Sequence, residues 1–129
     1  GLVQHYDRRL AMQLLADGFV LIFTAGTGNP FFTTDSAGCL RAIEIQADLM
    51  LKATRVDGVY SSDPEKDPNA IFYPTLTFDE AISKNLKVMD ATALTLARDH
   101  KLPINVFNVG KEHALKQIIC GESIGTIIS

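Results

Sequence analysis

The chain has 129 residues, 47% of them apolar, and its 12 basic and 15 acidic side chains give a formal net charge of -3. This length is typical of one domain with its own hydrophobic core. The longest run of basic residues is Arg8-Arg9, which is too short to form the positively charged surface that binds a nucleic-acid backbone. No apolar stretch reaches the roughly 20 residues that cross a bilayer. We therefore expect a cytoplasmic protein that binds neither nucleic acid nor a membrane.

The first half of the chain predicts a β-α-β unit preceded by a helix. Leucines at helical spacing indicate an amphipathic helix over Asp7–Ala16. The apolar run Phe19–Phe23 is too short for a helix and is rich in strand formers, so we expect a parallel strand covered on both faces. A helix over Ser36–Ala47 and a strand over Leu49–Ala53 follow.

The second half of the chain continues the alternation of helices and strands. Asp57–Pro74 contains three prolines without sustained periodicity, which predicts a long loop with a short strand near Ile71–Tyr73. Thr77 and Glu80 form a capping-box pattern, which places a helix over Glu80–Lys84. We further expect a helix at 90–101, a strand at 102–107, a helix at 113–120 and a last strand at 126–128. This order predicts an α/β fold, with a mostly parallel sheet between helices.

Two loops are candidates for binding because ligands of α/β sheets lie beyond the carboxyl ends of the strands. The first, Gly26–Asp35, combines two glycines with hydroxyl groups and precedes a helix, which suits a nucleotide or phosphate. A tight turn with an ordinary helix cap remains an equal alternative. The second, Lys52–Pro64, offers Tyr60 to stack on a purine and Thr54 to bond its edge. Its Asp-Gly and Asp-Pro pairs are equally typical of a surface loop.

Four long segments of the sequence resemble those of one known family. They are GTGNPFFTTD at 26–35, LKATRVDGVYSSDP at 51–64, LKVMDATALTLARDHKLPI at 86–104 and VFN at 106–108. The chain resembles the bacterial UMP kinases of the amino acid kinase family along essentially all of its length. This resemblance implies a three-layer α/β/α fold and transfer of the γ-phosphate of ATP to UMP, with Mg²⁺ accompanying ATP. It also implies a hexamer that GTP activates and UTP inhibits.

The resemblance implies roles for individual residues. The UMP wall comprises Thr27, Gly28, Asn29, Pro30, Phe31, Phe32, Thr33 and Thr34. Asp35 matches an aspartate that organises catalytic lysines, and Thr54, Tyr60 and Asp63 match the adenosine pocket. Asp57 and Asp90 match positions near the phosphates. Lys52 is a charge in the same region to which no role is assigned, and no metal ligand is expected among the dispersed histidines His5, His100 and His113.

Several features of the family are missing from these 129 residues. The Lys-Leu-Ser-Gly strand, the Gly-Gly-Gly-Asn loop and the acidic residue for the ribose do not occur. We therefore expect a single-domain fragment over 1–129, the C-terminal part of the fold, with an acceptor loop at 26–35 and an ATP loop at 52–64. Two alternatives stay open: a non-catalytic nucleotide-binding fragment, or a family member that phosphorylates a carboxylate or carbamate.

Overall fold

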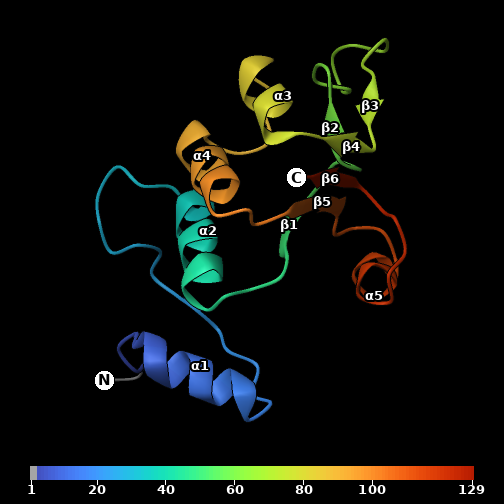
Figure 1. The fold of residues 1–129 in the computed structure, drawn as a ribbon. Coiled ribbons are helices and arrows are strands. Elements are labelled where there is room, and N and C mark those ends of the chain that lie inside the picture. Colours follow the sequence, from blue (N-terminus) through green and yellow to red (C-terminus); the bar gives the residue numbers. More distant parts are fainter. Residues whose placement is uncertain (1–2) are drawn as a thin grey trace.

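A computed structural model describes residues 3–129 and contains five helices and six strands over that range (Figure 1). The helices are α1 (Arg8–Ala16), α2 (Thr34–Glu44), α3 (Phe78–Ser83), α4 (Ala91–Asp99) and α5 (Ala114–Ile119). The strands are β1 (Met50–Thr54), β2 (Val59–Tyr60), β3 (Phe72–Tyr73), β4 (Thr75–Leu76), β5 (Ile104–Asn108) and β6 (Thr126–Ile128). None of the helices in this range is both long and apolar enough to cross a membrane.

Four of the strands form the main sheet in the order β1-β5-β6-β4. The pairs β1–β5 and β4–β6 are parallel, whereas β5 and β6 are antiparallel, so the predicted mostly parallel sheet is confirmed. Met50 pairs with Ile104 and Thr54 pairs with Asn108. Because β1 and β5 run in the same direction, both end at the same edge of the sheet.

Helices cover both faces of this sheet. The larger core joins Cys39 of α2 and Leu94 of α4 to Ile104 and Val106 of β5, all of them buried. A smaller core on the other face packs α5 against Phe107. The alternation of Val106 and Phe107 between the two cores is the period of a strand that is covered on both sides.

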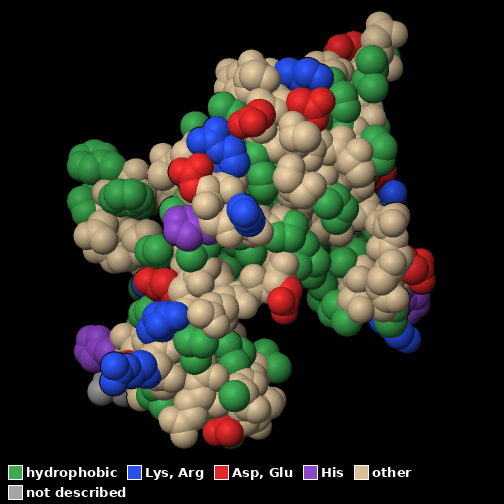
Figure 2. Space-filling view, in the orientation of Figure 1, with side chains coloured by type: hydrophobic (Ala, Val, Ile, Leu, Met, Phe, Trp, Pro, Cys, Tyr) green, Lys and Arg blue, Asp and Glu red, His purple; other side chains and the backbone are tan. Residues whose placement is uncertain are grey.

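Helix α1 forms a separate lobe below the sheet, joined to the body through α2 (Figures 1 and 2). The Arg8 side chain donates a hydrogen bond to the carbonyl of Glu44 at 2.6 Å. The guanidinium of Arg41 lies 3.9 Å from the centre of the Tyr6 ring, a cation–π contact. Polar and aromatic contacts therefore anchor this lobe to the end of α2.

The predicted buried strand at Phe19–Phe23 is wrong in this structure. These residues form no strand, and Val20 and Ile22 are 92% and 86% exposed. A parallel strand exists only where a neighbouring strand satisfies its backbone groups, and within residues 3–129 this segment has no such neighbour. The expected β-α-β unit therefore does not form, although its helix and its second strand do.

Local sequence signals predicted most other elements. Asp7 caps α1 through the Leu10 amide, and Thr77 and Glu80 form the reciprocal capping box at α3. The short strand expected near Ile71–Tyr73 is confirmed as β3, and it pairs in an antiparallel ladder with β2, which was not predicted. The strand β4 was not predicted; its two residues give too short a pattern to detect.

Two glycines before β6 allow a matched stability test. Gly125 has φ +78°, and a Cβ there would collide with the Val106 carbonyl oxygen. Gly121 has φ +92° but open space around it. We expect Gly121→Ala to lower the free energy of unfolding by about 1 to 2 kcal/mol, the cost of a left-handed L-residue. Gly125→Ala adds the clash, so we expect about 3 kcal/mol or more. Equal losses in a denaturant titration would contradict the close approach at Gly125.

Candidate functional site

The N-termini of α2 and α4 meet at the edge of the sheet where β1 and β5 end. Each helix is followed by one of these strands, so both helices start at that edge (Figure 1). Thr33 is the N-cap of α2 and accepts a hydrogen bond from the Ser36 amide. Asp90 is the N-cap of α4 and accepts one from the Ala93 amide. Two helix N-termini side by side create a region that favours negative charge.

Lys52 and Asp35 form an ion pair within this region. The Lys52 Nζ donates to the Asp35 Oδ2 at 2.7 Å and to the Val88 carbonyl at 2.7 Å. The two side chains are only 20% and 29% exposed. Asp35 is therefore not the helix cap that the alternative interpretation allowed, because Thr33 fills that position. The ion pair joins β1, the start of α2 and the segment before α4.

Asp90 accepts hydrogen bonds from both helices. Its carboxylate accepts a hydrogen bond from the Ala93 amide at 2.8 Å. It also accepts hydrogen bonds from the hydroxyl groups of Thr33 and Ser36, the latter at 3.2 Å. Partial burial raises the pKa of Asp90, but the bonds from Thr33, Ala93, Ser36 and Thr92 outweigh it, so the pKa lies below its ordinary value. Asp90 is therefore a carboxylate tied to the protein on several sides.

The loop before α2 is exposed and held in an unusual backbone conformation. Ala25, Gly26, Gly28 and Phe31 all have positive φ angles, and the Phe31 side chain is fully exposed. The Thr27 hydroxyl accepts from the Asn29 amide at 3.1 Å, and the Asn29 side chain donates to the Thr27 carbonyl. The loop is thus folded on itself and presents Asn29, Pro30 and Phe31 outward.

The second predicted loop forms one wall of a pocket of about 420 Å³. Tyr60 and Asp63 line it together with Asn85, Leu86 and Lys87. The Tyr60 ring packs edge-to-face against Phe72 at 5.3 Å. The Thr54 hydroxyl does not line this pocket, because it donates to the Val56 carbonyl at 2.8 Å and accepts from the Val56 amide. Thr54 therefore shapes the loop.

Asp57 lies in a different network from Asp90. It accepts from the Asn108 side chain at 3.1 Å and pairs with Lys111 at 3.0 Å. The Asn108 hydrogen bond, followed by Lys111, lowers the pKa of Asp57. The two carboxylates, which the resemblance places near the same phosphates, thus belong to separate hydrogen-bond networks. Asp57 connects the segments that follow β1 and β5, and Asp90 connects the N-termini of α2 and α4.

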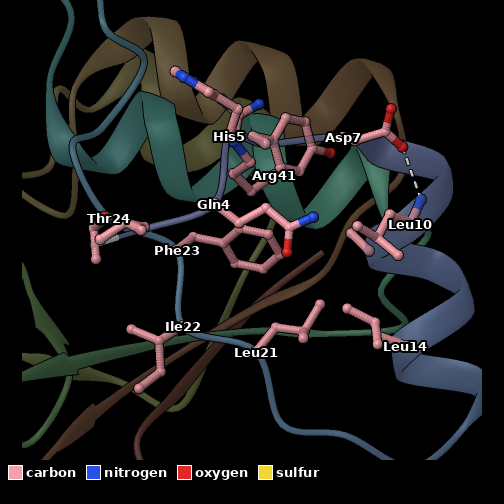
Figure 3. A pocket seen from close by; sticks show the side chains of 13 residues that line it. Gln4, His5, Asp7, Leu10, Leu14, Leu21, Ile22, Phe23, Thr24 and Arg41 are labelled. Carbon is pink, nitrogen blue, oxygen red and sulfur yellow. Dashed lines mark hydrogen bonds between the residues drawn. The ribbon is translucent and has the colours of Figure 1, made fainter. Parts of the chain in front are cut away.

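A further pocket lies between α1 and segment 21–24, away from this region (Figure 3). Leu10, Leu14, Leu21 and Phe23 give it a mainly apolar wall, with Arg41 at one side. Its lining includes none of the predicted site residues that the structure describes. Within residues 3–129, no group of three or more His, Cys, Asp or Glu side chains is arranged to hold a metal ion.

Comparison with known proteins identifies the family. The model of the amino acid kinase family matches residues 1–108. The chain belongs to the amino acid kinase family. A uridylate kinase of Stutzerimonas stutzeri is 61% identical over 128 residues, which are 99% of this chain and 52% of that protein.

Solved structures give the same assignment of the fold. A UMP kinase of Bacillus anthracis matches with a TM-score of 0.97 and 40% identity, over 99% of this chain and 53% of the other. A UMP kinase of Ureaplasma parvum matches with a TM-score of 0.91 and 42% identity, over 99% and 55%. The chain therefore spans about half the length of the relatives it matches, and its fold is part of theirs.

Sequence analysis assigned no role to Lys52, because its partner becomes clear only once the direction of its face of β1 is known. Side chains two positions apart in a strand share a face. Met50 contacts Cys39 of α2, so the face of β1 that carries Met50 points to this helix. Lys52 is on the same face, and an aspartate in the first turn of α2 is its natural partner.

The low pKa of Asp90 predicts how its contribution to stability depends on pH. Because the folded-state pKa lies below the unfolded value of about 3.9, the contribution is fully present above that value. It is lost as the pH falls through the folded-state pKa. We expect Asp90→Asn to lower the free energy of unfolding near pH 7, and the difference from wild type to shrink below about pH 4. A difference that stays constant from pH 7 to pH 3 in denaturant titrations would contradict this.

Proposed function

We propose that the protein to which this chain belongs transfers the γ-phosphate of ATP to UMP. The observation that carries the proposal is the GTGNPFFTTD loop, which leads into α2 beside the Lys52–Asp35 pair. Two relatives that align with 99% of the chain, at 61% and 40% identity, are named uridylate kinase and UMP kinase. The amino acid kinase family supports phosphoryl transfer in general, and the loop supports UMP as acceptor.

The proposed reaction depends on positioning and charge rather than on a general base. The phosphate of UMP has a second pKa of about 6, so it is largely a dianion at neutral pH and attacks without deprotonation. In the loose transition state, negative charge spreads over the oxygens of the transferred group. Lys52 supplies a cation near this charge, and Asp35 fixes the direction of its Nζ. The two helix N-termini add backbone donors.

In this proposal the two loops hold the two substrates. Residues Thr27–Thr34 form the wall for UMP, and Tyr60 and Asp63 line the pocket for adenosine, with Thr54 shaping its loop. Mg²⁺ fits as an ion carried by the phosphates of ATP, which is its usual mode in kinases. The described residues provide single carboxylates rather than a closed metal cage. Hexamer formation, activation by GTP and inhibition by UTP belong to the same proposal.

The substrate assignment is tested with the native full-length protein, Mg²⁺ and ATP. We expect UDP from UMP, and a much lower rate with CMP as matched acceptor. Phosphorylation of aspartate or acetylglutamate instead would establish a carboxylate kinase. Binding of UMP by calorimetry without turnover would establish a non-catalytic nucleotide-binding protein.

Asp35 is expected to affect turnover more than acceptor binding. Asp35→Asn keeps the shape of the side chain but removes the charge that orients Lys52, so we expect kcat to fall by about 10²-fold. The KM for UMP should change less than threefold. Asp79→Asn is the control, because Asp79 also pairs with a basic residue, Arg98, but on the surface of α3. Equal losses in kcat and in UMP affinity for Asp35→Asn would refute this role.

A further inference from the structure

We propose that Asp90 is a positioning residue for the acceptor loop and acts through the hydroxyl of Thr33. This inference rests on the proposed function, because it assigns the loop 27–34 to the acceptor. The family resemblance implies a position of Asp90 near the phosphates, and this inference gives Asp90 an indirect role there, through Thr33.

The hydrogen bonds of Thr33 leave its hydroxyl little freedom. A threonine hydroxyl has one proton to donate. Thr33 gives this proton to Asp90 and accepts the Ser36 amide at 3.1 Å. The hydroxyl therefore cannot also donate to UMP while this arrangement holds. What Thr33 contributes is the position of the chain where the loop enters α2.

Asp90 is itself anchored in the body of the protein. Its carboxylate caps α4 through the Ala93 amide, and two residues earlier the Val88 carbonyl accepts from Lys52 of β1. The acceptor loop has its own internal bonds between Thr27 and Asn29, but Thr33 and Ser36 connect its end to this anchored carboxylate. Asp90 is thus fixed by the body of the protein, and its hydrogen bonds hold the end of the loop.

The charge of Asp90 supports the indirect role. A carboxylate facing substrate phosphates would repel them. Here the negative charge of the carboxylate is stabilised by hydrogen bonds from one backbone amide and two hydroxyls at the start of two helices. Its oxygens accept hydrogen bonds within the protein, so its role beside the acceptor is structural.

The experiment is a double-mutant cycle in the native full-length protein. Asp90→Asn retains a cap for α4, since asparagine is a good N-cap residue, but one of its two oxygens becomes an amide. Thr33→Val removes the hydroxyl, and Thr33→Ser retains it. Asp7→Asn is the matched control, because Asp7 caps α1 in the same way, through a hydrogen bond from the Leu10 amide within its own helix. Thermal unfolding checks that each variant is folded.

We expect Asp90→Asn to raise the KM for UMP about tenfold, which corresponds to 1.4 kcal/mol. The KM for ATP should stay within twofold. Thr33→Val should show the same pattern, Thr33→Ser should restore the wild-type KM, and the double variant Asp90→Asn with Thr33→Val should be no worse than Thr33→Val alone.

Two results would overturn the inference. One is a double variant whose rise in the KM for UMP is the product of the two single effects, because Asp90 would then act independently of Thr33. The other is an equal rise in the KM for both substrates, which a general loss of structure produces. If the wild-type protein did not phosphorylate UMP, the proposed function would fail first, before any variant is compared.

Discussion

The charge of Lys52 in the edge strand of the sheet constrains the whole region around it. A lysine that is largely removed from water needs partners, because an unpaired ammonium group in such a place is costly. Its partners are Asp35, 17 positions earlier, and the Val88 carbonyl, 36 positions later. The hydrogen bonds of the Lys52 ammonium group thus hold the first turn of α2 and the segment before α4 against β1. The two helix N-termini are brought together as a consequence.

This constraint explains how the exposed loop that we propose for the acceptor is held in place. Loop residues contribute little packing of their own: Phe31 is fully exposed and its backbone is in the left-handed region. The position of the loop must then come from its ends. At its carboxyl end the hydroxyl of Thr33 and the carboxylate of Asp35 are both bonded, one to the α4 side and one to β1. The base of the loop is therefore fixed by hydrogen bonds, whereas its tip, including Phe31, is exposed.

The sequence predicted those features that depend on neighbours in the chain and missed those that depend on distant ones. The capping box of Thr77 and Glu80 spans four residues, and it formed as predicted. Phe19–Phe23 has the composition of a buried strand, but a strand requires a partner, and within residues 3–129 there is none. The role of Lys52 required knowing that its face of β1 points to α2. Asp57 and Asp90 looked equivalent in sequence, yet their bonding partners lie 51 and 57 positions away and differ in kind.

The segment Asn85–Asp90 has a place in the fold that bears on the proposed reaction. Its first three residues line the same pocket as Tyr60, its Val88 carbonyl accepts a hydrogen bond from Lys52, and its last residue, Asp90, accepts one from Thr33. One stretch of six residues therefore contacts the proposed adenosine pocket, the Lys52 ammonium group and the base of the proposed acceptor loop. In-line transfer needs the donor and acceptor at a fixed separation, and misplacement by about 1 Å is enough to lower the rate by orders of magnitude. Because one short segment contacts both proposed substrate regions, it can set their separation with few residues.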